Sequence, residues 1–255
     1  MQNIISFLTR TIPRPLLIRL SYFGRGILSF YYRGDKLEDP ISGKTYRKFL
    51  PYGRIHSREN ALCPGSLSLE RHRLLWLFLK RKTDFFTASR RMLHVAPEQC
   101  FIDLFRAQQN LDYTTGDLFS PLADVKMDMH AIPFEENTFD VLFCNHVMEH
   151  VADDLACMKE VYRVLKPGGF AILQVPSNYD RATTYEDASI TDPKEREKAF
   201  GQDDHVREYG LDYGAILLKS GLTVREDHFL MNDLTAAERE RFALPSQEII
   251  YFCTK

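Results

Sequence analysis

Over residues 139–176, two continuous apolar runs enclose a stretch in which apolar residues recur at helical spacing. Phe139–Cys144 is a short apolar run, which predicts a buried strand. Residues 153–165 place apolar side chains at helical spacing and begin with two aspartates, which suit the positive end of a helix dipole. Lys166-Pro167-Gly168-Gly169 should end that helix, and residues 170–175 form a second apolar run. The pattern predicts a strand, a crossover helix and a second, parallel strand.

Similar patterns occur on both sides of this stretch and predict an α/β fold. Further strands are expected at 92–96, 111–115, 124–127, 222–229 and 248–253. Helices are expected at 68–82, at 98–109, and after residue 209 as far as Ser220-Gly221. The polar stretch after Pro176, residues 177–207, is expected to be a long loop, of the kind that forms a lid or an acceptor loop.

Composition narrows the class of protein. A chain of 255 residues can hold one sizeable α/β domain with an extension, and 44% hydrophobic with 27% charged residues is typical of a globular protein. No apolar run approaches the roughly 20 residues of a membrane-spanning helix, and no cleavable signal peptide is evident. The five cysteines are scattered, which favours reduced thiols and a cytoplasmic location.

Charge is distributed unevenly along the chain. Residues 1–36 contain six basic residues and one acid, a net charge of +5, so the rest carries −7 of the total of −2. Apolar residues at helical spacing in this segment favour N-terminal helices that pack on the protein. The alternative is a basic amphipathic anchor, peripheral at the inner membrane surface, or a docking helix for a partner. The acidic remainder argues against a nucleic-acid partner. The oligomeric state is not predicted.

Four phrases in fixed order carry a family resemblance. They are Ile132-Pro133-Phe134, Asn137-Thr138-Phe139-Asp140, Glu149-His150-Val151 and the run from Arg163 to Gly169. Together they resemble the second half of a class I S-adenosylmethionine-dependent methyltransferase domain of the type 11 kind. The match runs from about Met92 to the C-terminus.

The resemblance implies a Rossmann-like, seven-stranded, mostly parallel sheet with helices on both faces and the last strand antiparallel. It places the methyltransferase domain at residues 68–255. It also implies S-adenosylmethionine as cofactor and methyl transfer to an oxygen or nitrogen of a small-molecule acceptor. The alternative is a methyltransferase-like binding or scaffold protein that has lost catalysis.

Residues 37–67 resemble a degenerate zinc knuckle that precedes the domain in some bacterial methyltransferases. Replacing Asp39, Ser42 and Ser66 by cysteine would give, with Cys63, two Cys-x2-Cys pairs. A single thiolate cannot hold a structural zinc ion, so we expect no metal in this segment. The fold of the knuckle could then be held by packing.

The first strand is followed by a loop that departs from the family. Its glycine-rich turn is replaced by His94-Val95-Ala96-Pro97-Glu98, with His94 where an acid is common. The resemblance places His94, Ala96, Pro97 and Glu98 at the cofactor. Helix N-terminal amides remain available for the methionine carboxylate, and Glu98 could meet the α-ammonium group. Alternatively, Glu98 only complements the helix dipole.

Two acids follow the next two strands. Asp117, with Leu118 beside it, is placed to accept the ribose hydroxyls, although a turn aspartate would look the same. Asp128, followed by Met129, fits the acid that binds the adenine amine in the family.

The fourth strand is followed by Asn145 and His146, which the resemblance places beside the sulfonium. His146-x-x-Glu149-His150 also reads as an inverted zinc-protease signature, but that requires one helix and a further ligand downstream, so no metal is predicted. Because a hydroxyl acceptor must lose a proton, His146 or His205 is the expected catalytic base. Asp204 could orient His205, or it could cap the next helix.

Overall fold

The structure is a computed structural model that describes residues 24–53, 57–121 and 123–255. The chain forms two compact units. The first contains residues 1–84 and 229–248, and the second contains residues 85–228 and 249–255. The chain therefore divides at Asp84, so the helix expected at 68–82 belongs to the first unit. Most of the basic segment 1–36 lies outside the described residues; within it, residues 24–31 are helical.

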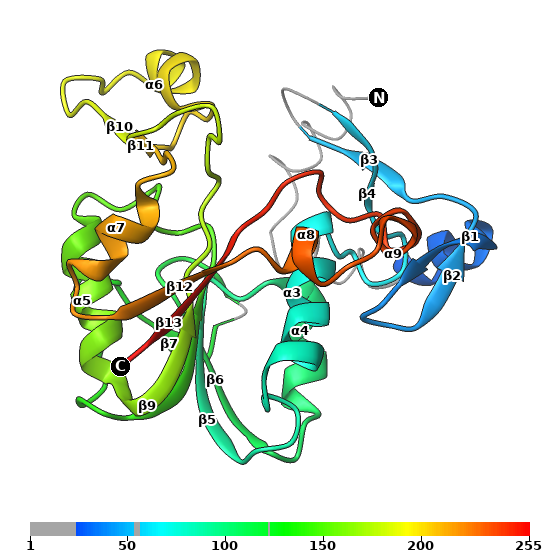
Figure 1. The fold of residues 1–255 in the computed structure, drawn as a ribbon, viewed down its shortest axis with the longest axis horizontal. Helices are drawn as coiled ribbons and strands as arrows, with labels where there is room; N and C mark the ends of the chain where they lie inside the picture. The colour runs from blue at the N-terminus through cyan, green and yellow to red at the C-terminus, as the bar shows by residue number, and fades with distance from the viewer. Residues whose placement is uncertain (1–23, 54–56, 122) are drawn as a thin grey trace. The chain divides into compact units, whose positions relative to one another are not determined.

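The first unit contains two small antiparallel sheets and short helices (Figure 1). Its strands are β1 (Arg33–Asp39) paired with β2 (Lys44–Tyr46), and β3 (Leu50–Tyr52) paired with β4 (Arg58–Leu62). Its later helices are α3 (Glu70–Lys82), α8 (Phe229–Asn232) and α9 (Ala236–Arg241). None of the helices in the described part of the chain is long and apolar enough to cross a membrane.

Two side chains near the start of the α3 helix make buried contacts. The N-cap of α3 is Leu69, and the hydroxyl of the preceding Ser68 donates to Asp39 at 3.2 Å. Arg73 is buried, although an arginine on a helix usually lies on a solvated face. The Arg73 guanidinium donates to the carbonyl groups of Ala61, Ser68, Phe242 and Ala243. Since two of those carbonyls come from a turn about 170 residues later, helical periodicity could not reveal them.

The second unit is built on the seven-stranded sheet that the sequence predicts, in the order β12-β13-β9-β8-β5-β6-β7. The strands are β5 (Arg90–Val95), β6 (Leu111–Asp117), β7 (Val125–Lys126), β8 (Phe139–Cys144), β9 (Leu165–Ile172), β12 (Thr223–Asp227) and β13 (Ile250–Thr254). The strands from β7 to β9 are parallel, and β13 runs antiparallel to both of its neighbours. The predicted fold class is confirmed.

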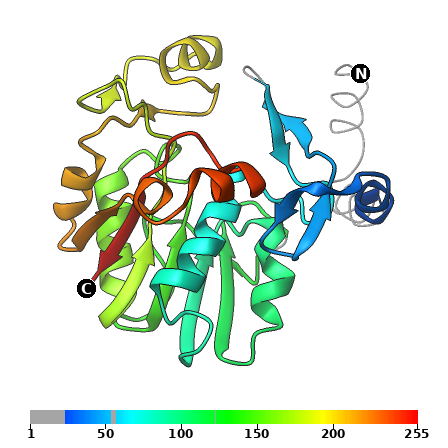
Figure 2. The ribbon, with the colours of Figure 1, turned by 45° about the vertical axis from the view of Figure 1, so that its right-hand side comes forward.

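The helices of this unit cover both faces of the sheet. The connection from β5 to β6 runs through α4 (Gln99–Arg106), and the connection from β8 to β9 runs through α5 (Asp154–Val164) in the opposite direction along the sheet. Because both crossovers are right-handed, opposite directions place the helices on opposite faces. Figure 1 shows α5 and α7 (Tyr213–Leu218) on one side and α4 on the other, and the turned view in Figure 2 agrees. The direction reverses between β5 and β8, which is where ligands bind in open α/β sheets.

The end of α5 differs from the sequence expectation. The helix begins as predicted, with Asp153 accepting a hydrogen bond from the amide of Ala156. However, β9 starts at Leu165, so the expected helix-stopping turn lies inside the strand. The amide of Gly168 donates to the carbonyl of Lys255, and the amide of Lys255 donates to that of Gly169. Those bonds to the last residue extend the strand.

Residues 177–207 are more ordered than the expected loop. They contain β10 (Tyr185–Glu186), the helix α6 (Pro193–Phe200) and the start of β11 (Arg207–Glu208), which pairs antiparallel with β10. The carboxylate of Asp192 caps α6 by accepting from two amides, and Gly201 ends it in the left-handed conformation that glycine favours. The expectation of irregular structure was wrong, and the role of the segment as a lid stays a prediction.

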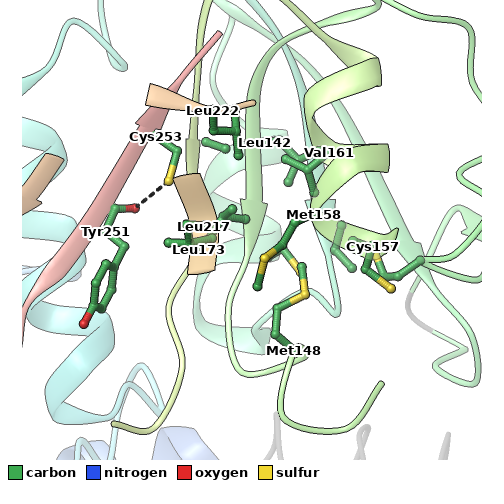
Figure 3. Packing of buried hydrophobic residues seen from close by; sticks show 14 of the residues in the cluster. Leu142, Met148, Cys157, Met158, Val161, Leu173, Leu217, Leu222, Tyr251 and Cys253 are labelled. Carbon is green, nitrogen blue, oxygen red and sulfur yellow. Dashed lines mark hydrogen bonds between the residues drawn. The ribbon is translucent and has the colours of Figure 1, made fainter. Parts of the chain in front are cut away.

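The core of the second unit lies between α5, α7 and the sheet (Figure 3). Leu142 comes from β8, Leu173 directly follows β9, and Met158 and Val161 come from α5; all four are fully buried. Met148, from the segment after β8, is also fully buried in this cluster. The core therefore fixes the turn that carries the residues after β8.

The salt bridge between Asp140 and Lys166, at the amino ends of β8 and β9, predicts how the stability of the fold depends on pH. Burial disfavours the charged form of Asp140, but hydrogen bonds from the Arg91 amide and the Lys166 ammonium outweigh it and lower the pKa of Asp140. The group stabilises the fold above its unfolded pKa of about 3.9, and this contribution is lost as the pH falls through the lower folded value. We expect Lys166→Met to reduce the loss of unfolding free energy between pH 6 and about pH 3, measured by urea denaturation. Lys198→Met, at an exposed pair, should leave that loss unchanged.

Candidate functional site

Three neighbouring strands end at one level and bring the predicted cofactor residues to one edge of the sheet. Val95 of β5 pairs with Gly116 of β6 and with Cys144 of β8. Ala96, Asp117 and Asn145 are the residues that directly follow these three, and the Ala96 amide donates to the carbonyl of Gly116 at 2.9 Å. The carboxyl ends of parallel strands are the usual place for a ligand in such folds.

The loop after β5 lacks the glycines of the family and is held by a network of side-chain hydrogen bonds. Ala96 adopts a left-handed conformation with φ of 47°, which a small residue tolerates best. His94 is fully buried, with Nδ1 2.8 Å from the hydroxyl of Tyr113 and Nε2 paired with the carboxylate of Glu98. Asn145 donates to the other Glu98 oxygen at 3.0 Å. Both oxygens of Glu98 therefore have protein partners, and the network ties β5 to the segment after β8.

This network refines two predicted roles. The role of His94 at the cofactor stays a prediction; its two ring nitrogens face Tyr113 and Glu98, so the buried ring also supports the loop. Glu98 is the N-cap residue of α4, yet its side chain makes no capping hydrogen bond. Asn145 Oδ1 is buried and has no hydrogen-bond partner among the described residues. An orphan acceptor at the end of β8 suits an ammonium group of a ligand.

Asp117 ends β6 and organises the turn that follows. Its Oδ1 accepts the amides of Phe119 at 2.6 Å and Ser120 at 2.5 Å, as a turn aspartate does. The second carboxylate oxygen can still accept a ribose hydroxyl, so the two interpretations of Asp117 are compatible. Leu118 is 38% exposed and Phe119 is 82% exposed, which leaves apolar surface beside this acid.

Gly116 and Met127 bring the next strand close to Asp117. A methyl group on Gly116 would overlap the sulfur of Met127, so the Met127 side chain packs directly on the backbone of β6 and would have to shift to admit any larger residue. Asp128 then follows Met127, and its Oδ1 accepts the amide of His130 at 2.9 Å and lies 2.7 Å from Nδ1 of the His130 ring. These two hydrogen bonds lower the pKa of Asp128. The neighbouring Met129 is buried.

His130 has no role predicted from the sequence, because a histidine two residues after an aspartate forms no recognised motif. The structure shows that its ring and its amide hold one oxygen of Asp128 in place. The Asp128 side chain remains 54% exposed, so its other oxygen is accessible to a ligand.

A second cluster lies on the turn after Asn145. His146 has a positive φ of 56°, and its amide donates to the carbonyl of Gln174 at 2.7 Å. Its Nδ1 lies 3.4 Å from the carboxylate of Glu149, which is almost fully buried. Burial raises the pKa of Glu149, but the hydrogen bond from His146 outweighs it and the net shift is downward. Glu149 thus stays ionised beside the imidazole.

His205 belongs to the same cluster, although it is 55 residues away in sequence from His150. The rings of His150 and His205 lie edge to face with centroids 4.8 Å apart. Burial lowers the pKa of His205, and its Nδ1 lies 3.2 Å from the carbonyl of Phe200. Asp204 neither orients His205 nor caps α7: its carboxylate lies 3.5 Å from Nδ1 of His150, and Asp212 is the N-cap of α7. Both alternatives for Asp204 were wrong.

Arg207 explains how His205 reaches this position. Its guanidinium is 1% exposed and donates to the carbonyls of Met148 and Val151, each at 2.6 Å, and of Ala152 at 3.1 Å. In addition, the amide of Val206 donates to the carbonyl of Glu149 at 2.9 Å. These bonds fasten the 205–207 segment to the turn at 148–152. The sequence did not indicate that Glu149 pairs with His146, or that Arg207 holds the 205–207 segment against the turn at 148–152.

A small cavity of about 220 Å³ lies beside His205. It is lined by Pro176, Ser177, Asn178, Phe200, His205, Arg207 and Glu208. This volume is below the roughly 300 Å³ at which pockets for drug-sized ligands begin. The cavity can therefore hold only a small group.

The residues of the expected zinc knuckle meet in the first unit. Asp39 is fully buried and accepts from the Ser42 hydroxyl at 2.6 Å, and Ser66 donates to Ser68 at 2.9 Å. Cys63 is buried, and burial together with the nearby Asp39 charge raises the pKa of its thiol. The four positions form a hydrogen-bonded cluster that is suited to neutral thiol and hydroxyl groups. The likeness to a zinc knuckle stays a prediction.

The chain was compared with known protein families, curated proteins and solved structures. A sequence model described as a methyltransferase domain matches residues 85–173. A 44-residue stretch is 48% identical to cycloartenol-C-24-methyltransferase 1 from rice, and 63 residues are 33% identical to demethylmenaquinone methyltransferase from Lactococcus lactis. These matches cover 17% and 25% of this chain, but only 13% and 21% of the two relatives.

Among solved structures, an S-adenosylmethionine-dependent methyltransferase from Mesorhizobium loti is similar, with a TM-score of 0.47 and 16% identity. The superposition covers 71% of this chain and 97% of that one.

Proposed function

We propose that this chain, which carries a class I S-adenosylmethionine-dependent methyltransferase domain, transfers a methyl group to an oxygen or nitrogen of a small-molecule acceptor. S-adenosylmethionine is the cofactor of this domain and supplies both the methyl group and the sulfonium that activates it. The chain itself must bind, orient and, for a hydroxyl acceptor, remove a proton. The observation that carries the proposal is the shared edge at which Ala96, Asp117 and Asn145 follow three neighbouring strands.

The residues at that edge fit the adenosyl and amino-acid parts of the cofactor. Asp117 has one carboxylate oxygen in its own turn, and we assign the other to the ribose hydroxyls. Asp128 is half exposed after β7, and we assign its accessible oxygen to the adenine amine. The orphan Oδ1 of Asn145 is assigned to the α-ammonium group, a role for which Glu98 is less suited because both its oxygens have protein partners.

His146 is the general base of this proposal. Its Nδ1 faces the ionised carboxylate of Glu149, which holds a proton on that nitrogen and leaves Nε2 as the acceptor. Nε2 is buried without a hydrogen-bond partner among the described residues. The acceptor's hydroxyl proton would pass to Nε2 as the oxygen attacks the methyl carbon. His205 is not assigned this role, because its Nδ1 faces a backbone carbonyl and the ring is part of the cluster with His150.

The test is methyl transfer from labelled S-adenosylmethionine over a panel of hydroxyl, amine and carboxylate acceptors. Turnover on a hydroxyl acceptor should fall about 100-fold or more in His146→Ala, since general base catalysis contributes about 10²–10⁴-fold. Turnover on an amine or carboxylate acceptor should fall much less. His228→Ala removes an exposed histidine in the same unit and serves as the matched control.

The alternative function is a binding or scaffold protein that has lost catalysis. It is favoured by the loop at Ala96–Glu98, where a buried His94–Glu98 pair stands in place of the flexible glycines. Retained cofactor binding without turnover on any acceptor of the panel would favour this alternative. Turnover that falls equally with every acceptor class in the His146 variant would contradict the role of His146 as a base.

A further inference from the structure

Three potential metal ligands converge at the turn after β8. One ligand atom each from Glu149, His150 and His205 lies within 4.8 Å of the other two. Nε2 of His150 is 3.9 Å from the Glu149 carboxylate. Bonds of about 2.0–2.1 Å to a tetrahedral zinc ion place ligand atoms about 3.4 Å apart. The three side chains therefore need to close by no more than about 1.5 Å.

The two histidines of this group each have Nδ1 next to a protein oxygen, which fixes the orientation of the ring. Nδ1 of His205 faces the carbonyl of Phe200 at 3.2 Å, and Nδ1 of His150 faces the carbonyl of Asp204 at 3.3 Å and its carboxylate at 3.5 Å. A proton on Nδ1 leaves the lone pair on Nε2. This is the arrangement in which a backbone or carboxylate oxygen orients a metal-binding imidazole.

Buried polar atoms without partners mark the centre of the group. Among the described residues, Nε2 of His205 and Oε2 of Glu149 are buried and make no hydrogen bond. The two residues are 4% and 1% exposed. An unsatisfied buried acceptor is rare in folded proteins, and two of them side by side call for a shared partner. A cation satisfies both lone pairs and neutralises the Glu149 charge.

We propose that Glu149, His150 and His205 bind one divalent transition-metal ion, for which Zn²⁺ is the best fit. Two imidazoles and a carboxylate are a ligand set that zinc accepts with a fourth, open position. The His150 side chain is 35% exposed and gives the ion a route from solvent. His146 Nδ1, 3.4 Å from Oε1 of Glu149, orients that ligand.

This inference revises an expectation from the sequence, which predicted no metal for the His146-x-x-Glu149-His150 phrase. The phrase begins directly after a buried strand, whereas the zinc signature requires one helix and a further ligand downstream. The fold supplies that ligand, since Arg207 and the amide of Val206 fasten the segment with His205 to the turn that carries Glu149. The inference does not rest on methyl transfer, because its readout is binding of the metal alone.

The experiment uses the untagged full chain, stripped with a chelator and titrated with Zn²⁺ by calorimetry. We expect one ion per chain, and a dissociation constant weakened by at least about 100-fold in His150→Ala and in His205→Ala. His150→Ala is the decisive variant, because a side chain that is one-third exposed can be removed without unfolding the protein. His228→Ala should bind as the wild type does. Circular dichroism verifies that each variant is folded.

Two results would overturn the proposal. One is a wild-type titration without stoichiometric binding. The other is a folded His150→Ala variant that binds Zn²⁺ as tightly as the wild type. Loss of binding in both ligand variants, together with normal binding in His228→Ala, would establish the site.

Discussion

Arg207→Met should lower the free energy of unfolding by about 3–5 kcal/mol. The methionine keeps most of the apolar volume but removes every donor of the guanidinium. The carbonyls of Met148, Val151 and Ala152 would lose these hydrogen bonds, and Glu186 would lose its ion pair at 2.8 Å. Removing one partner of a buried charged network costs about this much, because the groups left behind stay buried without partners. Chemical denaturation at neutral pH measures the change.

Arg106→Met is the matched control for that experiment. Arg106 also forms an ion pair, with Asp124 at 2.6 Å, but its side chain is 45% exposed. Exposed pairs contribute at most about 1 kcal/mol, so the control should lose no more than that. Equal denaturant midpoints for the two variants would contradict the claim that the buried hydrogen bonds of Arg207 stabilise the fold. The Zn²⁺ affinity of the Arg207 variant should also fall, since His205 would no longer be held against the turn.

Asp117→Ala should weaken the binding of S-adenosylmethionine by about 10- to 100-fold. A hydrogen bond to a charged group contributes about 1.5–3 kcal/mol, and a factor of ten corresponds to about 1.4 kcal/mol. The variant also loses the acceptor for the amides of Phe119 and Ser120, so the turn beside the ribose becomes less ordered. Both effects act in the same direction, and isothermal titration measures their sum.

Asp112→Ala is the control on the same strand. Asp112 lies near the opposite end of β6, with a side chain that is 71% exposed and pairs with Arg91 at 3.3 Å. Its removal should leave the affinity within about twofold of the wild type, since surface pairs contribute little. An Asp117 variant that binds as the wild type does would remove Asp117 from the cofactor site.

The sheet could be predicted from the sequence because buried parallel strands read as continuous apolar runs. The strand Phe139–Cys144 has the same limits in the prediction and in the structure, and the other predicted strands differ from the observed ones by a few residues at their ends. The start of β9 was missed for a non-local reason. Leu165 pairs with Phe139 of β8, and Gly168 and Gly169 bond to Lys255, whereas the helix-stopping residues within the strand suggested a turn. Propensity gives way to tertiary hydrogen bonding at such places.

The site was only partly predictable. Positions at strand ends follow from the sheet, so the location of Asp117 and Asn145 at one edge could be predicted, and their roles at a cofactor stay predictions. The partners of those residues were not, because the His94–Glu98–Asn145 network joins two loops 47 residues apart in sequence. The same limit applies to Arg73 and Arg207. A buried arginine is recognised by the carbonyls around it, and one sequence does not show which carbonyls those are.

We assign the carboxyl edge of the sheet, at Ala96, Asp117, Asp128 and Asn145, to the binding of S-adenosylmethionine. Isothermal titration of the full wild-type chain with S-adenosylmethionine, and separately with its demethylated product, tests it most directly. We predict one molecule bound per chain with a micromolar dissociation constant, about −8 kcal/mol of binding free energy. A folded chain that binds neither compound would contradict the assignment of this edge as a cofactor site.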